Sequence, residues 1–145
     1  MAFSIAFTAE PLCYPYEDPT TPAASGLLTF GATKETFLSS LYEWTRKDYE
    51  QQWRQAIAAI LFQKSKAALI TSYGSPDNAT HLEWRPMYVV GSTVYLLFYD
   101  QLPKPFSIEN AFRFLRDRQT TNEEGKRISE REVSLAELED FARSL

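Results

Sequence analysis

The segment that decides how this chain folds is Trp44-Thr-Arg-Lys-Asp-Tyr-Glu-Gln-Gln-Trp-Arg-Gln-Ala-Ile-Ala-Ala-Ile-Leu61. Its apolar residues recur at intervals of three and four, which places them on one face of an α-helix. Thr45 stands where a helix N-cap is expected, and Asp48 complements the free N–H groups of the first turn. Because Trp53 and its aromatic neighbours bring large apolar surfaces to one element, we expect the domain to pack around a helix over about 46–63.

The sequence on either side of this helix predicts a sheet and two more helices. Alternation of apolar and polar residues indicates an antiparallel sheet of about five strands, most clearly as a meander over 67–100. Further helices are predicted at about 108–118 and 134–145, the last one opened by the capping box Ser134-x-x-Glu137. The pattern therefore predicts an α+β domain in which three helices pack on one sheet.

Length and composition indicate one intracellular domain. The 145 residues suit a single domain, 1–145, in which four prolines mark residues 10–26 as an extended loop. No apolar run is long enough to span a bilayer, and the first residues lack the basic start of a signal peptide. Cys13 is the only cysteine, which agrees with a reducing compartment. We therefore expect a cytoplasmic protein.

The sequence offers no pattern for catalysis or metal binding. Cys13 and His81 are the only residues of their kinds, whereas a structural zinc site needs four N or S ligands. The glycines do not form a phosphate-binding loop. Acidic pairs such as Glu139-Asp140 are adjacent in sequence, so they do not face a common substrate. We expect no enzyme activity, no metal and no cofactor, although a hydrolase triad assembled in space stays open at this point.

The charge of the chain favours a basic partner over nucleic acid. The net charge is −4, whereas general nucleic-acid binding draws its affinity from Lys and Arg at phosphates. An acidic surface can steer a basic protein partner, or it can simply be an ordinary solvated surface. The aromatic side chains of the predicted meander leave one alternative, a single-stranded nucleic-acid-binding module on a similar sheet-and-helix scaffold. Few basic residues lie between these aromatics, so core packing explains them better.

Two strings resemble a known family. Residues 42–53 have the pattern Y-x-W-x-x-K-D-Y-x-x-x-W. Residues 118–130, Arg-Gln-Thr-Thr-Asn-Glu-Glu-Gly-Lys-Arg-Ile-Ser-Glu, have the pattern R-x-T-T-x-x-x-G-x-x-I-S-E. With the chain length and the order of elements, these strings resemble a family of contact-dependent growth inhibition immunity proteins over about 27–145.

The resemblance implies a function in toxin inhibition. A protein of this family binds and neutralises a cognate toxin C-terminal domain by occluding its active site or its substrate-binding surface, without catalysis of its own. The resemblance further implies that the toxin is a nuclease acting on ribosomal RNA, and such nucleases tend to be basic. The resemblance implies neither a membrane partner nor direct binding to nucleic acid. The motif residues are expected to serve the structure, and they are Trp44, Asp48, Tyr49, Trp53 and Gly125.

Candidate toxin contacts rest on charge and position, because interfaces that discriminate between cognate partners vary. Exposed acids near turns and strand ends would meet a basic toxin, and aromatic side chains at the same rim would anchor it. The acidic candidates are Asp77, Glu83, Asp100, Glu123, Glu124 and Glu130. The aromatic candidates are Tyr73 and Tyr99.

Overall fold

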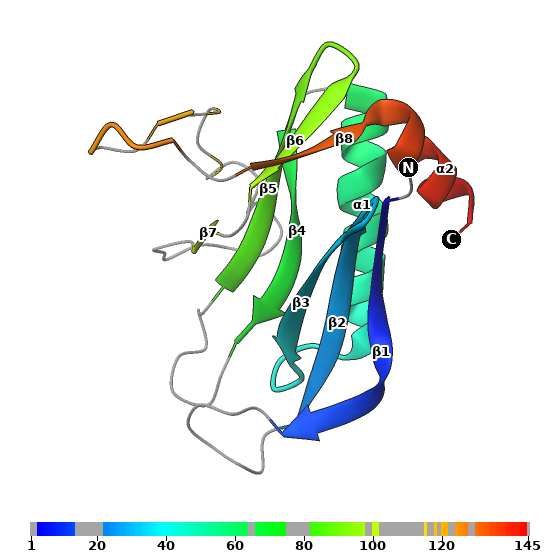
Figure 1. The fold of residues 1–145 in the computed structure, drawn as a ribbon. Helices are drawn as coiled ribbons and strands as arrows, with labels where there is room; N and C mark the ends of the chain where they lie inside the picture. Colours follow the sequence, from blue (N-terminus) through cyan, green and yellow to red (C-terminus); the bar gives the residue numbers. More distant parts are fainter. Residues whose placement is uncertain are drawn as a thin grey trace.

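The described part of the computed structural model comprises two antiparallel sheets and two helices (Figure 1). The described residues are 3–13, 22–63, 66–74, 82–97, 100–101, 115, 118, 120–121, 124–127 and 130–144. Their elements, in chain order, are β1 (Phe3–Cys13), β2 (Pro22–Phe30), β3 (Thr33–Ser40), α1 (Arg46–Gln63), β4 (Lys66–Tyr73), β5 (Leu82–Val90), β6 (Thr93–Leu97), β7 (Asp100–Gln101), β8 (Glu130–Ser134) and α2 (Leu135–Arg143).

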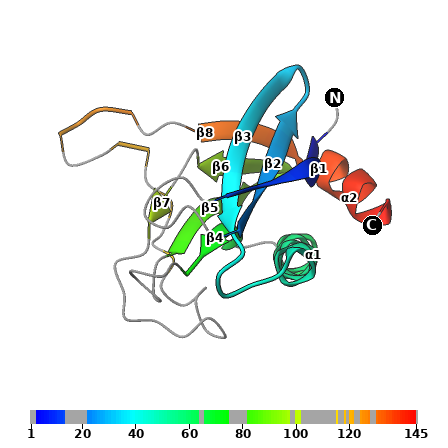
Figure 2. The same cartoon turned by 90° about the horizontal axis from the view of Figure 1, so that it is seen from below.

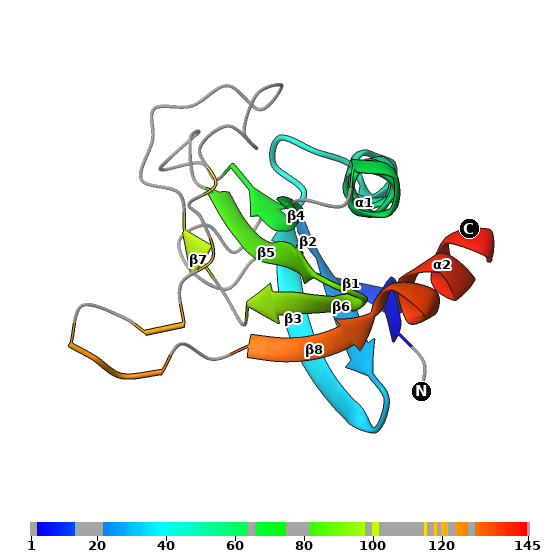
Figure 3. The same ribbon diagram turned by 90° about the horizontal axis from the view of Figure 1, so that it is seen from above.

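The two sheets have different strand orders. The first has the order β1-β2-β3, and the second has the order β4-β5-β6-β8 with β7 added beside β5. The sheets touch where β3 contacts β4 and where β2 contacts β8. Helix α1 packs mainly on β4 and is seen end-on beside it in Figure 2. Helix α2 follows β8 directly and contacts α1 and β1 (Figure 3).

The predicted single sheet with three helices is wrong for the described residues, which form two sheets and two helices. The first three strands pair with one another and form a sheet of their own, since the tight turn at Gly31 folds β3 back onto β2. Residues 14–21 of the predicted loop 10–26 lie outside the described residues, while β1 extends through Pro11 to Cys13. Of the predicted helix 108–118, only Leu115 and Arg118 are described, and neither is helical.

The core forms around the buried face of α1. The helix starts at a reciprocal cap in which the Asp48 N–H donates to Thr45 Oγ1 at 3.3 Å and the Thr45 N–H donates to Asp48 Oδ2 at 2.9 Å. Phe7 of β1 brings the first sheet to this helix, with its ring 4.9 Å from that of Trp53. The helix residues buried in the core are Tyr49, Trp53, Ala56, Ile57 and Ile60.

Side chains of α1 complete the outer edge of the second sheet along β4. The Gln52 amide donates to the Ala68 carbonyl at 2.8 Å and accepts from the Ile70 N–H at 2.9 Å. The Trp53 indole N–H donates to the Ile70 carbonyl at 2.7 Å. Because none of the described strands pairs with β4 on this side, these bonds satisfy backbone groups that would otherwise lack a partner.

Side-chain bonds also join β3 to β4 where the two sheets meet. The Tyr49 hydroxyl donates to the Ser40 carbonyl and accepts from the Tyr73 N–H at 3.0 Å. The Ser39 hydroxyl donates to the Thr71 carbonyl, and both serines of β3 are fully buried. The junction between the sheets therefore depends on hydroxyl groups as well as apolar packing.

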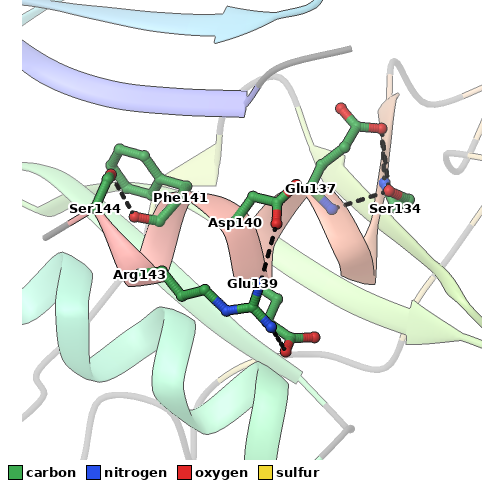
Figure 4. A network of polar contacts seen from close by, with 7 residues as sticks. All are labelled: Ser134, Glu137, Glu139, Asp140, Phe141, Arg143 and Ser144. Carbon is green, nitrogen blue, oxygen red and sulfur yellow. Dashed lines mark hydrogen bonds and ion pairs between the residues drawn. The ribbon is translucent and has the colours of Figure 1, made fainter.

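The C-terminal helix α2 is capped and charged as its sequence predicts (Figure 4). The Glu137 N–H donates to the Ser134 hydroxyl at 3.1 Å, and the Glu137 carboxylate accepts from the Ser134 N–H at 3.4 Å. Arg143 pairs with Glu139 at 2.7 Å on the exposed side of the helix. Among the described residues, no helix is long and apolar enough to cross a membrane.

Candidate binding surfaces

Trp44, Tyr49 and Trp53 of the first string, 42–53, make their contacts inside the fold. Trp44 packs its ring 5.1 Å from Tyr49 and 5.2 Å from Tyr73. Tyr49 and Trp53 are buried and bonded to backbone groups of β3 and β4, and Asp48 closes the cap of α1. Tyr49 and Trp53 hold α1 against the junction of the two sheets and present little surface to a partner, whereas Asp48 is exposed.

Three of the predicted contact residues lie on strands at one end of the second sheet, although Tyr73 and Glu83 point to opposite faces of it. The register pairs Ser72 with Glu83 and Trp84 with Asp100, so Tyr73, Glu83 and Asp100 belong to neighbouring strands there. Glu83 is half-buried. Tyr73 is also half-buried, and its burial together with the nearby Glu43 carboxylate raises the pKa of its phenol. Only part of this sheet end is therefore open to a partner.

A second surface is formed by residues 118–130, which we call the arm. Its described residues leave the body of the molecule in all three views, opposite to α2 (Figures 1, 2 and 3). Thr121 and Arg127 form an antiparallel bridge, and Gly125 beyond it has φ of 81°. This positive φ explains the glycine of the second motif, because other residues rarely adopt it. The exposed described residues of the arm are Thr120, Thr121, Glu124, Gly125, Lys126 and Arg127.

The base of the arm is held by three side chains that we call the clamp: Arg118, Glu130 and Tyr95. The Arg118 guanidinium donates to Glu130 from Nε at 3.0 Å and from a terminal nitrogen at 2.9 Å. It also lies over the ring of Tyr95, 3.9 Å from the centroid. The hydrogen bonds to Glu130 raise the pKa of the Arg118 guanidinium above its ordinary value.

One of the predicted contact residues, Glu130, belongs to the clamp. Glu130 was expected to be an exposed acid, but its side chain is only 7% exposed and is occupied by Arg118. Glu124, by contrast, is exposed and lies 3.9 Å from Lys126. The remaining candidates Asp77, Glu123 and Tyr99 lie outside the described residues.

Sequence reasoning missed a buried ion cluster between the sheets. Glu35 of β3 accepts from Arg85 of β5 at 2.7 Å and from Arg131 of β8 at 2.8 Å. The Glu35 and Arg85 side chains are 9% and 6% exposed. No signal in the sequence joins these residues, since they are far apart along the chain. Among the described residues, no group of three His, Cys, Asp or Glu is placed to hold a metal ion.

Residues 39–141 match the family model described as the CdiI N-terminal domain. The chain belongs to this family. The resemblance to contact-dependent growth inhibition immunity proteins is thereby confirmed. The chain is 29% identical over 106 residues to Immunity protein CdiI of Enterobacter cloacae subsp. cloacae, an alignment that covers 70% of this chain and 72% of that protein.

A solved structure extends the likeness beyond the matched segment. It is described as the CdiA-CT/CdiI toxin and immunity complex from Enterobacter cloacae, and one of its chains matches with a TM-score of 0.84 and 25% identity. The match covers 98% of this chain and 97% of that chain. The CdiI family model begins only at Ser39, near the end of β3. The three-stranded sheet is therefore shared with that structure even though most of it precedes the family match.

Proposed function

We propose that this CdiI family member binds the toxin domain of its own contact-dependent growth inhibition system and neutralises it in the cytoplasm. Inhibition works by occlusion of the toxin's active site or substrate-binding surface, with no catalysis by the immunity protein. The single observation that carries this proposal is the match, over 98% of the chain, to a structure of a toxin and immunity complex.

The proposal also names the class of toxin as a nuclease that acts on ribosomal RNA. The support comes from the two sequence strings and from the net charge of −4, which suits a basic nuclease. Such a partner would be drawn to acidic side chains before contact, so association should weaken as salt is added.

The nucleic-acid-binding alternative receives no support from those aromatic side chains of the second sheet that the structure describes. Trp84 and Tyr88 are buried, at 1% and 7% exposure, and so are not available to stack on bases. Tyr95 is half-buried, and its ring is covered by Arg118.

The test is co-production of this chain with the toxin domain encoded beside it. We expect a one-to-one complex, restored growth of the poisoned cells, and intact ribosomal RNA in the rescued cells. Growth restored while ribosomal RNA was never cut would remove the nuclease assignment and leave the immunity function. Absence of both complex and rescue would overturn the proposal.

A charge-reversal variant tests whether Glu123 and Glu124 contact the toxin. Replacing Glu123 and Glu124 by lysine should slow association and reduce its salt dependence, because the steering charges change sign. The matched control reverses the adjacent pair Glu139 and Asp140 on α2, which carries the same change of charge on the opposite side of the molecule. Equal effects of the two reversals would show that only net charge matters.

A further inference from the structure

The described residues of the arm contribute little to the folded core. Its described residues between Arg118 and Glu130 are exposed and include no large apolar side chain. Connections between neighbouring elements commonly need only a few residues, and longer ones usually have a function. Because the described residues of the arm add no large apolar side chain to the core, core packing does not account for them.

The base of the arm is nevertheless fixed. The Arg118–Glu130 pair has two parallel hydrogen bonds, a geometry that sets the plane of both groups. Tyr95 supports the guanidinium from β6, and Glu130 is held in register opposite Leu97 of the same strand. The direction in which the arm leaves the sheet therefore depends on the clamp.

The chemistry at the tip suits a protein surface. Glu124, Lys126 and Arg127 present both signs of charge within four residues, and the side chains of Glu124 and Lys126 are 76% and 78% exposed. The hydroxyl groups of Thr120 and Thr121 add exposed donors and acceptors. A nucleic acid would favour positive charge alone, whereas a protein with polar and charged side chains of its own can use this mixture.

We propose that the arm is the element that docks on the toxin, and that the clamp holds it in the binding direction before the toxin arrives. This inference rests on the proposed function, because it takes the toxin as the partner. A preformed arm loses less conformational freedom on binding than a loose one, which raises affinity without any added contact.

The first experiment breaks the clamp without touching the tip. In Arg118→Gln the two bonds to Glu130 and the charge over Tyr95 are lost, so fewer molecules hold the arm in the binding direction. We expect toxin association to slow about tenfold, with the dissociation rate little changed. The double variant Arg118→Glu, Glu130→Arg restores an ion pair and should recover much of that loss.

The second experiment removes the tip and leaves the clamp. Replacing residues 122–126 by two glycines keeps Arg118, Glu130 and the paired positions Thr121 and Arg127. We expect faster toxin dissociation, because contacts are lost, and an unchanged urea midpoint for the folded chain. If Arg118→Gln fails to fold, this second variant still tests whether the arm docks on the toxin.

The matched control is Arg143→Gln, which breaks the exposed pair with Glu139 on α2. Its toxin-binding rates should equal those of the wild-type chain. If the wild-type chain binds the toxin and the folded arm variants bind it at unchanged rates, the docking role of the arm is overturned while the proposed function stands. If the wild-type chain binds no toxin, the proposed function itself fails.

Discussion

The two sequence strings that resemble the family, 42–53 and 118–130, lie in different environments. Tyr49 and Trp53 of the first string lie in the core, where they bond to the backbone of the sheets. The arm, 118–130, leaves the body, and of its described residues only Arg118 and Glu130 at its ends are partly covered. The first string therefore contributes to the core, and the second places an exposed segment. Substitutions should separate these two roles, since the first string should govern stability and the second should govern binding.

The largest expected effect is at Trp53. Replacing Trp53 by alanine removes a buried ring and the bond to the Ile70 carbonyl, and should lower the free energy of unfolding by about 3–5 kcal/mol. Urea denaturation measures this loss. Molecules that remain folded should bind the toxin as the wild-type chain does. A stable Trp53→Ala variant with weakened binding would place this string at the interface and break the comparison.

The next largest loss of stability is expected at Glu35, whose carboxylate accepts hydrogen bonds from both Arg85 and Arg131. Glu35→Gln removes the charge from a nearly buried cluster and should lower the free energy of unfolding by about 2–3 kcal/mol. The control is Glu139→Gln in the exposed pair with Arg143, where a loss of no more than about 1 kcal/mol is expected. Equal losses in the two variants would mean that burial of the cluster does not increase its contribution to the free energy of unfolding.

A smaller loss is expected at Tyr49. Tyr49→Phe keeps the ring but removes the hydroxyl that donates to the Ser40 carbonyl and accepts from the Tyr73 N–H. The free energy of unfolding should fall by about 1–2 kcal/mol, because buried backbone groups lose a partner. Hydrogen exchange should show faster exchange at the Tyr73 amide. No change at that amide would contradict the assigned bond.

A substitution at Gly125 tests whether the arm serves binding and not stability. Gly125→Ala must adopt a φ of 81°, which costs about 1 kcal/mol, although no atom lies within 4 Å of the added methyl group. Global stability should change little, since the arm is exposed. Toxin binding should weaken if the arm docks as we propose. A large shift of the urea midpoint would show that the arm supports the fold after all.

The smallest effect concerns pH and Tyr73. Its phenol pKa is raised above the ordinary 10.0 by burial and by Glu43, so the folded chain holds this proton more tightly than the unfolded chain does. The stability linked to this group is therefore present below pH 10 and is lost as the pH rises through the folded pKa. Wild-type stability should fall more steeply there than that of Tyr73→Phe. Identical slopes would contradict the shift.

Local patterns in the sequence were sufficient for the helices that the structure describes. Helix α1 occupies 46–63 because its apolar period and its cap are both encoded within the segment. Helix α2 begins after Ser134 for the same reason. The division of the strands into two sheets was missed, because alternation identifies a strand but does not name the strand it pairs with.

The candidate site was harder to predict for a similar reason. Glu130 lies among alternating charges and was taken for an exposed acid, but Arg118 returns to it across the arm. The signal was present in the second string, which starts with arginine and ends with glutamate on either side of a turn glycine. Nothing local shows that these two ends meet, and nothing local places Tyr95 beneath them.

The bond between Gln52 and β4 has a consequence for the free protein. The edge strand of a sheet can pair with a strand from another copy of the same chain, which starts aggregation. The Gln52 side chain ends in an amide, the same chemical group as a peptide bond, and it occupies the Ala68 and Ile70 positions that such a strand would use. Along β4, the chain's own helix therefore closes this route to self-association.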